Sequence, residues 1–263
     1  MKKYFVIGNP IDHSLSPELH NYWLKKNNID GVYDKKKLDS NDLKDLVLKI
    51  KNNEINGLNI TVPFKNEIIP YLDELSNESK STQSVNTIYS YKNKIIGHNT
   101  DIDGFELAIK NTGHEVNGKK ILILGAGGVV PSIIFALNKM GASEIILSNR
   151  TKHKAETLKK LFKNLSVVDW GQIPYFDMIV NATSLGLNNN ENIDLDFSKI
   201  EKNKFFFDVI YNPKETNFLH TGKNLGNKTE NGKKMFLHQA AEAFKIWHNI
   251  QPEINEEVSK LLD

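Results

Sequence analysis

Two hydrophobic patterns alternate along the chain. Short apolar runs rich in β-branched and aromatic residues, such as 4–8 and 119–125, are typical of buried strands. Between them, apolar residues recur every three or four positions, which is the period of an amphipathic helix. The runs predict strands at 4–8, 55–62, 119–125, 144–149, 177–182 and 204–210. The periodic stretches predict helices at 16–28, 40–52, 103–113, 129–141, 152–162 and 233–249.

Polar residues mark the ends of several of these elements. Ser16 and Ser40 are expected as the N-caps of the first two helices. Residues 86–99 predict a hairpin. Strands that alternate with helices form parallel sheets covered on both faces. We therefore expect an α/β fold with a parallel sheet.

The alternation is denser in the second half of the chain than in the first. Residues 100–120 provide a plausible connector between an N-terminal α/β unit and this denser unit. The asparagine-rich stretch 188–192 predicts a loop. The pattern leaves open which unit the helix at 233–249 packs against.

Composition narrows the class of protein. The apolar and charged fractions, 39% and 25%, are those of an ordinary globular protein, and the net charge of +2 gives no support for a nucleic-acid partner. The absence of cysteine excludes thiolate catalysis and cysteine-based zinc sites, and no metal is expected. The apolar run at the N-terminus is too short for a signal peptide, and no stretch approaches the roughly 20 apolar residues of a membrane span. A cytoplasmic protein is the expectation.

A glycine-rich turn joins the predicted strand at 119–125 to the helix that follows. Gly125, Gly127 and Gly128 stand at this junction. Glycines there let the backbone approach a pyrophosphate closely, and the helix N-terminus offers unpaired N–H groups. The alternative is a tight turn with no ligand. We interpret the turn as a dinucleotide-binding site.

Arg150 is the only arginine in the chain, and it follows the strand after the glycine turn. In proteins of this type an acidic residue at that strand end binds the ribose of NAD, whereas an arginine binds the 2′-phosphate of NADP. A guanidinium holds a phosphate with two parallel hydrogen bonds, which an ammonium cannot do. The sequence therefore favours NADP over NAD.

The N-terminal half carries polar residues near the ends of its predicted strands. Ser14 and Ser16 precede a helix, where hydroxyls and unpaired N–H groups can hold a carboxylate, although Ser16 is also explained as a cap alone. Ligand sites form at strand ends in α/β sheets. The other candidates are Asn59, Thr61, Lys65, Asn86, Asn99, Thr100, Asp101 and Asp103.

Nine short sequence blocks follow one another along the chain in a specific order. They are GNPIDHSLSPELHN, NITVPFK, VNTI, GHNTDIDGF, GAGG, NRT, NATSLG, DVIYNPKET and NGKKMFLHQAAEAF. Over essentially the whole chain this order resembles the shikimate dehydrogenase family. The resemblance implies a two-domain α/β enzyme that reversibly reduces 3-dehydroshikimate to shikimate with NADPH, in the pathway of chorismate and aromatic amino-acid biosynthesis. It also implies an active site between the domains and a monomer or homodimer.

The family's domains and functional residues can be carried over position by position. The resemblance implies a substrate-binding and catalytic domain over 1–104, completed by helices in 235–263, and an NADP-binding Rossmann domain over 105–234. The catalytic pair matches Lys65 and Asp101. The substrate residues match Ser14, Ser16, Asn59, Thr61, Asn86, Tyr211 and Gln239, with the serines on the carboxylate. The cofactor residues match Gly125, Ala126, Gly127, Gly128, Val129, Asn149, Arg150, Thr151, Thr183 and Gly232.

The chemistry of the predicted pair is consistent with this activity. Reducing a ketone leaves negative charge on oxygen, so a proton donor is needed there, and the reverse reaction needs an acceptor. We expect Lys65 to exchange the proton with the substrate oxygen and Asp101 to orient Lys65 and relay the proton, and which of the two carries the proton is left open. Two other readings are an NAD-dependent quinate/shikimate dehydrogenase and a non-catalytic sensing relative.

The chain departs from the family pattern beside the glycine turn. Alanines and often a second arginine are usual there, whereas this chain has Val129, Val130 and Pro131. Arg150 therefore lacks the usual second cation, and Lys152 and Lys154 are the candidates to assist it.

Overall fold

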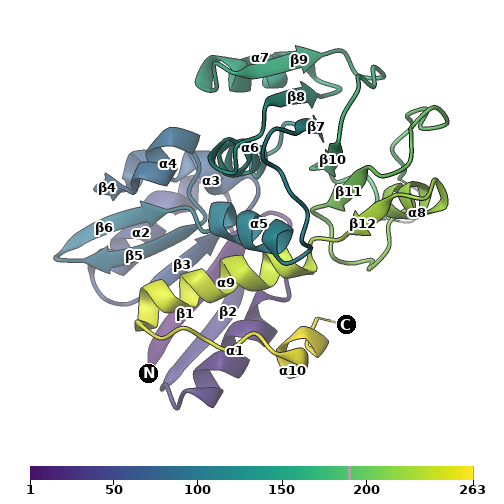
Figure 1. The fold of residues 1–263 in the computed structure, drawn as a ribbon. Helices are drawn as coiled ribbons and strands as arrows, with labels where there is room; N and C mark the ends of the chain where they lie inside the picture. Colours follow the sequence, from purple (N-terminus) through teal and green to yellow (C-terminus); the bar gives the residue numbers. More distant parts are fainter. Residues whose placement is uncertain (189–190, 263) are drawn as a thin grey trace. The chain divides into compact units, whose positions relative to one another are not determined.

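The computed structural model of the chain describes residues 1–188 and 191–262. The chain divides into two compact units, residues 1–104 with 237–263 and residues 105–236 (Figure 1). The boundaries fall inside helices α5 (Asp101–Lys110) and α9 (Lys233–His248). Residues 189 and 190, in the middle of the asparagine-rich stretch, lie outside the described residues.

A six-stranded mixed sheet forms the centre of the first unit, in the order β2-β1-β3-β5-β6-β4. Its strands are β1 (Lys2–Gly8), β2 (Gly31–Lys37), β3 (Gly57–Ile60), β4 (Glu74–Leu75), β5 (Thr87–Tyr91) and β6 (Lys94–His98). β1 runs parallel to β2 and β3, but β5 is antiparallel to β3 and to β6. The predicted hairpin at 86–99 is confirmed. Because it reverses the chain direction, the prediction of a parallel sheet is wrong for this unit.

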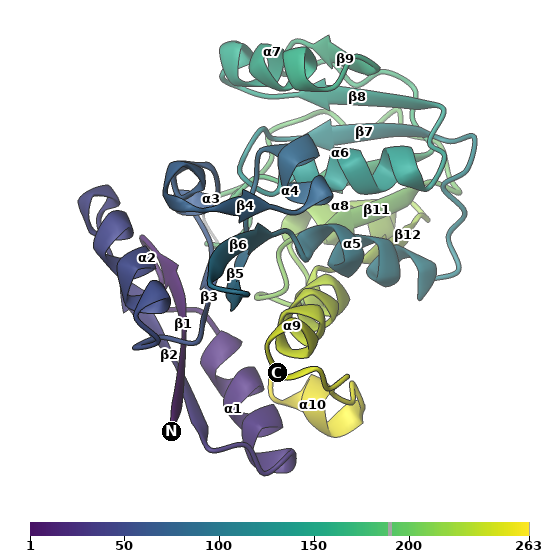
Figure 2. The ribbon, with the colours of Figure 1, turned by 90° about the vertical axis from the view of Figure 1, so that its left-hand side faces the viewer.

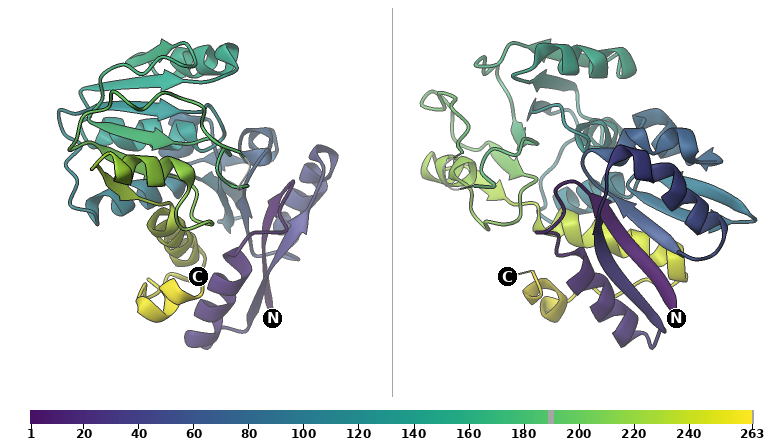
Figure 3. Two further views of the ribbon diagram at one scale, coloured as in Figure 1. Left: turned by 90° about the vertical axis from the view of Figure 1, so that its right-hand side faces the viewer. Right: turned by 180° about the vertical axis from the view of Figure 1, so that it is seen from behind.

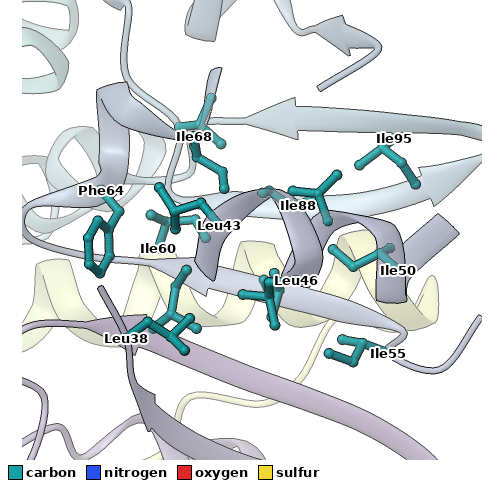
Figure 4. Close-up of a cluster of buried hydrophobic side chains, with 14 residues drawn as sticks. Leu38, Leu43, Leu46, Ile50, Ile55, Ile60, Phe64, Ile68, Ile88 and Ile95 are labelled. Atoms are coloured by element: carbon teal, nitrogen blue, oxygen red, sulfur yellow. The ribbon is translucent and has the colours of Figure 1, made fainter. Parts of the chain in front are cut away.

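Helix α2 (Leu43–Lys51) covers one face of this sheet with a purely apolar layer (Figure 4). Every second residue of a strand faces the same side, so Leu58 and Ile60 of β3 both enter this layer. The layer contains Ile7, Leu38, Leu43, Leu46, Val47, Ile50, Ile55, Leu58, Ile60, Phe64, Ile68, Val85, Ile88 and Ile95. The alternate residues Gly57 and Asn59 therefore face the other side.

Helices α1 (Ser16–Lys26) and α9 lie on the opposite face (Figure 2). The side chains between these helices and the sheet are mostly aromatic. They include Tyr4, His20, Trp23, Tyr33, Phe244, Trp247 and His248. The indole N–H of Trp247 donates to the Ile88 carbonyl at 3.1 Å, and a Cβ at Gly57 would lie 2.3 Å from that nitrogen. Gly57 thus allows α9 to pack closely on β3.

A fully parallel six-stranded sheet forms the second unit. Its strands are β7 (Lys120–Leu124), β8 (Glu144–Ser148), β9 (Leu165–Val168), β10 (Met178–Asn181), β11 (Phe205–Asp208) and β12 (Lys228–Glu230). From β9 to β12 the order is 3-2-1-4-5-6, that of a dinucleotide-binding Rossmann sheet. Helices α6 (Val130–Lys139) and α8 (Asn217–Asn224) lie on opposite faces (Figures 2 and 3). The prediction of a parallel sheet covered on both faces is confirmed here.

Several helix ends differ from the prediction. Ser16 is the first residue of α1 and not its cap, because the Ser14 hydroxyl accepts a hydrogen bond from the Ser16 N–H at 3.3 Å. Ser40 begins a 3₁₀ turn that ends at Asp42 and follows Asp39, so it does not cap α2 either. Helix α5 begins two residues earlier than expected, which places Asp101 in its first turn.

Helix α7 (Lys152–Leu161) was predicted. The pattern did not predict the other remaining elements individually. They are β2, β4, β9, β12, α3 (Phe64–Glu67), α4 (Asn77–Thr82), α8, α10 (Glu256–Lys260) and a 3₁₀ turn at Ile69–Tyr71. None of the helices in the described parts of the chain has the length and apolar character needed to cross a bilayer.

Candidate active site

Lys65 and Asp101 form a buried ion pair in the first unit. The Lys65 ammonium, in α3, lies 2.6 Å from Oδ2 of Asp101, and their side chains are 11% and 8% exposed. The backbone N–H of Asp101 donates to the Asn99 side chain at 3.1 Å. Asp101 also stands in the first turn of α5, where a negative charge is favoured by the helix dipole. The structure therefore brings together the two residues predicted as the acid/base pair.

Asn86 connects this pair to the polar residues around it. Its side-chain nitrogen donates to Oδ1 of Asp101 at 2.9 Å and to Oε1 of Gln239, in α9, at 3.4 Å. Its side-chain oxygen accepts from the backbone N–H of Thr100 at 2.8 Å. Asn86 and Thr100 are almost completely buried. Both oxygens of Asp101 are thus engaged, one by Lys65 and the other by Asn86.

Asn59, on β3, extends the network away from the ion pair. Its side-chain nitrogen donates to the Asn86 carbonyl and to the Thr87 hydroxyl, both at 3.1 Å, and its oxygen accepts from the Tyr33 hydroxyl at 2.7 Å. Thr87 and Tyr33 were missed by the sequence analysis. Neither contact leaves a local signal, because Tyr33 is 26 residues from Asn59 in the chain and lies on an unpredicted strand.

Ser14 and Ser16 lie together at the start of α1. The Ser14 hydroxyl donates to the Ser16 hydroxyl at 3.2 Å, and the Ser16 side chain is largely buried. Thr61 directly follows β3, and its backbone N–H donates to the Ile7 carbonyl at 2.9 Å. Six of the predicted substrate residues therefore belong to the first unit, whereas Tyr211 belongs to the second.

The predicted glycine turn links β7 to α6 in the second unit. Gly125 has a φ of +108°, and a Cβ there would lie 2.8 Å from the Ala182 carbonyl oxygen, so this position requires glycine. At Gly127 the nearest atom to a Cβ would be the Ala182 carbonyl oxygen at 3.9 Å, an ordinary contact, so this position is less crowded than Gly125. Val129 directly precedes α6, whose first residue, Val130, is fully buried. Without side chains at its glycines, the turn lets a pyrophosphate approach the backbone closely.

Asn149, Arg150 and Thr151 connect β8 to α7. The Asn149 side chain donates to the Thr151 carbonyl at 2.8 Å, which closes a local turn around Arg150. Arg150 is exposed, and within residues 1–188 and 191–262 no hydrogen bond or ion pair engages its guanidinium. Lys152, by contrast, is 2.6 Å from the Asp169 carboxylate. Of these two cations, Lys152 is paired and Arg150, within the described part of the chain, is not.

A second polar network surrounds Asp208 at the ends of β10 and β11. The Asp208 carboxylate accepts from the Asn181 side chain at 3.0 Å, the Thr216 hydroxyl at 2.6 Å and the Ile210 N–H at 3.0 Å. Burial raises the pKa of Asp208 to about 6, although these hydrogen bonds act against the rise. Asn181 also accepts from the Thr183 hydroxyl at 2.7 Å. The sequence analysis named Thr183 but missed the residues that hold it.

Gly232 and Tyr211 complete the predicted set. A Cβ at Gly232 would lie 2.0 Å from the Val209 carbonyl oxygen, so only glycine fits there. The Tyr211 ring lies 4.7 Å from that of Phe236. Together with Thr183, these residues lie after β10, β11 and β12, at the edge of the sheet where α/β proteins bind ligands.

The donor set fits a phosphorylated dinucleotide better than a metal. The glycines of the turn and the exposed Arg150 suit a pyrophosphate and a further phosphate. Among the described residues, no group of three His, Asp or Glu side chains is placed to hold a metal ion.

Comparisons with known proteins give a consistent result. Residues 6–88 match the family model described as shikimate dehydrogenase substrate binding domain, and residues 106–217 match the model described as shikimate / quinate 5-dehydrogenase. The shikimate dehydrogenase (NADP(+)) of Pelagibacter ubique is 57% identical over 264 residues, covering 100% of both chains.

Solved structures agree with the sequence relatives. The shikimate dehydrogenase of Aquifex aeolicus is 38% identical, with a TM-score of 0.91 over 100% of this chain and 97% of that one. The shikimate 5-dehydrogenase of Thermus thermophilus, solved in complex with NADP(H) and shikimate, is 30% identical, with a TM-score of 0.90 over 100% and 98% of the two chains.

Proposed function

This chain belongs to the shikimate dehydrogenase family, and we propose that it catalyses the reversible NADPH-dependent reduction of 3-dehydroshikimate to shikimate. It is an NADP-dependent oxidoreductase of the pathway to chorismate and the aromatic amino acids. One observation carries the assignment: 57% identity to an NADP-dependent shikimate dehydrogenase over the full length of both chains, in a protein that has the buried Lys65–Asp101 pair.

Lys65 exchanges the proton at the substrate oxygen. Bound NADPH supplies the hydride, which leaves negative charge on the ketone oxygen, and the Lys65 ammonium donates a proton to that oxygen. In the oxidation of shikimate, the neutral Lys65 amine accepts the hydroxyl proton. Asp101 holds Lys65 by an ion pair of 2.6 Å, and Asn86 holds the second oxygen of Asp101. This arrangement supports an orienting role for Asp101 and gives a route for relaying the proton.

The remaining predicted residues bind the substrate and the cofactor. Ser14 and Ser16 bind the substrate carboxylate, with Tyr211 near it, while the ring hydroxyls are bound by Asn59, Thr61, Asn86 and Gln239. The glycine turn from Gly125 to Val129 binds the pyrophosphate, and the segment from Asn149 to Thr151 binds the adenosine end. Thr183 and Gly232 lie near the nicotinamide. The hydrogen bonds that link Asn59, Asn86 and Gln239 support a common substrate site.

The domains take separate roles in this proposal. Residues 1–104 with the helices in 235–263 form the substrate-binding and catalytic domain, and residues 105–234 form the NADP-binding domain. The two family models, which match residues 6–88 and 106–217, support the division. A monomer or homodimer and a cytoplasmic location stay predictions.

The direct test is a turnover assay of the purified protein with shikimate or quinate, each combined with NADP⁺ or NAD⁺. Formation of reduced nicotinamide is followed by its absorbance. We expect turnover chiefly with shikimate and NADP⁺, because Arg150 replaces the acidic residue typical of NAD sites. Preference for quinate and NAD⁺ would favour the quinate/shikimate alternative. No turnover in any combination would reject the enzyme assignment and favour a sensing role.

Two lysine variants connect this activity to the buried ion pair. Lys65→Ala should lower kcat by about 10² to 10⁴, the usual contribution of a positioned proton donor, with KM for NADP⁺ little changed. Lys110→Ala is the matched control, because it removes a lysine paired at 2.5 Å with Glu106 on α5, the helix that carries Asp101. Near-normal turnover in Lys65→Ala would reject its role.

A further inference from the structure

Tyr33 is held in place by the helix that carries Ser16. The side chain of Asn21, in α1, donates to the Tyr33 carbonyl at 2.7 Å and accepts from the Tyr33 N–H at 2.9 Å. His20, on the same helix, stacks on the Tyr33 ring with a centroid distance of 4.2 Å and an interplanar angle of 3°. Both the backbone and the ring of Tyr33 are therefore fixed by α1.

His20 contributes to this arrangement only by packing. Burial, together with a smaller effect of His248, lowers the pKa of His20 to about 3, so the imidazole is neutral near pH 7. Neither of its nitrogens has a hydrogen-bond partner among the described residues. A neutral ring that stacks flat on Tyr33 restricts the phenol without competing for its hydrogen bonds.

The hydroxyl of Tyr33 contacts Asn59, a residue of the proposed substrate site. Tyr33 lies on β2, and Asn59 lies on β3, with β1 between the two strands. The Tyr33 side chain reaches across β1 and donates to Oδ1 of Asn59 at 2.7 Å. Burial raises the pKa of the Tyr33 phenol well above its ordinary value, although the nearby Ser16 acts against this rise. The phenol is thus neutral and available as a donor to Asn59.

Within the described part of the chain, the hydrogen bonds of Asn59 leave it one free acceptor site. Its side-chain oxygen accepts from the Tyr33 hydroxyl at 2.7 Å. Asn59 uses both of its N–H groups within the protein, on the Asn86 carbonyl and the Thr87 hydroxyl. A side-chain amide has two donors and two acceptor lone pairs, so one lone pair of the Asn59 oxygen remains. Asn59 can therefore only accept a hydrogen bond from a substrate hydroxyl.

We propose that Tyr33 is a positioning residue for substrate binding: α1, the helix of the carboxylate-binding Ser16, holds its ring and backbone, and its hydroxyl holds the hydroxyl-binding Asn59. The inference rests on the proposed function, because the ligand is taken to carry a carboxylate and ring hydroxyls. Tyr33 fixes the Asn59 amide with its oxygen as the acceptor and sets its distance from Ser16. The two ends of the substrate are then bound by groups that are preorganised with respect to each other, which lowers the cost of binding.

The test compares Tyr33→Phe with Tyr4→Phe in steady-state kinetics on the full-length protein. Tyr4 is the register partner of Tyr33 on β1 and belongs to the same aromatic layer. Within the described residues its hydroxyl makes no hydrogen bond, so Tyr4→Phe controls for the loss of a tyrosine hydroxyl from this layer. Tyr33→Phe should raise KM for shikimate about tenfold, the equivalent of 1.4 kcal/mol, while kcat and KM for NADP⁺ change far less. Tyr4→Phe should leave all three constants near those of the wild type.

A double variant tests whether Tyr33 acts through Asn59. In an Asn59→Ala background, Tyr33→Phe should have a much smaller effect on KM for shikimate than in the wild type, because the two residues are directly coupled. Equal effects in both backgrounds, or equal KM values for Tyr33→Phe and Tyr4→Phe, would overturn the proposal. If Tyr33→Phe does not fold, Asn21→Ala replaces it, and an unchanged KM for shikimate in that variant would count against the positioning role.

Direct titration separates this proposal from the assignment of the activity. Binding of shikimate is measured by calorimetry without cofactor. If the wild type binds shikimate but does not turn it over, the proposed reaction fails, and a weaker affinity in Tyr33→Phe than in Tyr4→Phe still supports the positioning role. If the wild type turns shikimate over and both variants bind it equally well, the reaction stands and the role of Tyr33 is rejected. A wild type that neither binds nor turns over shikimate would reject both.

Discussion

In the proposed function, Arg150 selects NADP through its shape as much as its charge. Its guanidinium is exposed, uncommitted within the described residues, and positioned just after β8. Arg150→Lys keeps the charge but removes the planar pair of donors that matches a phosphate. We expect this variant to raise KM for NADP⁺ about tenfold and to change KM for NAD⁺ much less, since NAD⁺ lacks the 2′-phosphate.

The control for this prediction is Lys159→Ala, which removes a positive charge in the last turn of α7. It should leave KM for both cofactors near the wild-type values. Lys159 lies at the far end of α7 from Arg150, and salt screens an exposed charge there. Lys152→Ala should also have a small effect, since Lys152 is already paired with Asp169. Equal weakening of NADP⁺ and NAD⁺ in Arg150→Lys would contradict the 2′-phosphate interpretation.

At the scale of elements, the Asp208 carboxylate links the ends of β10 and β11 to the start of α8. We expect the stability of this junction to depend on pH. The pKa of Asp208, about 6 in the folded protein, is above the ordinary value of 3.8. Its contribution to stability is therefore fully present below about pH 4 and is lost as the pH rises through 6. Compared with Asp208→Asn, the wild type should lose about 2 kcal/mol of unfolding free energy between pH 4.5 and pH 7.5. Urea unfolding at the two pH values measures this difference.

Asp196→Asn is the matched control for that pH dependence. Hydrogen bonds from the Ser198 hydroxyl and backbone lower the pKa of the exposed Asp196, so its contribution is lost as the pH falls. The difference in unfolding free energy between the wild type and Asp196→Asn should therefore rise with pH, opposite to Asp208→Asn, and by a smaller amount. The same direction for both variants would show that Asp208 is not the group that titrates.

Local signals explain which elements could be predicted. The strand, glycine turn and helix from β7 to α6 carry their pattern within a continuous stretch, and they were found at nearly the correct bounds. Strand β2, GVYDKKK, was missed because it lies at the sheet edge and its outer residues are polar. Ser16 was wrongly expected as a cap because nothing in the sequence shows that Ser14 accepts from its N–H.

The residues of the candidate site also fall into two groups, those that the sequence could predict and those that it could not. Lys65, Asp101 and Arg150 could be named because a charged residue at a strand end is visible in the sequence and because the family pattern marks it. Tyr33 and Asp208 could not, since each acts through a partner more than 20 residues away, Asn59 for Tyr33 and Asn181 for Asp208. Their importance comes from burial and hydrogen bonding, which only the folded chain creates.

At the scale of the whole molecule, the two units should respond to different ligands. A ligand that binds only the folded state stabilises it by about 2.7 kcal/mol at a concentration 100 times its Kd. NADP⁺ should therefore slow amide hydrogen exchange mainly in the second unit, around residues 125–132 and 149–151. Shikimate should slow it mainly in the first, around residues 86–101 and 237–241, where Asn86, Asp101 and Gln239 are linked.

Hydrogen exchange followed by mass spectrometry, with each ligand alone and with both, tests this division. Arg150→Lys provides the control, since at a fixed NADP⁺ concentration it should lose protection in the second unit and keep the protection that shikimate gives to the first. Protection of the first unit by NADP⁺ alone, or of the glycine turn by shikimate alone, would contradict the assignment of substrate and cofactor to separate units. Hydrogen exchange detects the local opening of each segment separately, so the result does not depend on how cooperatively the whole chain unfolds.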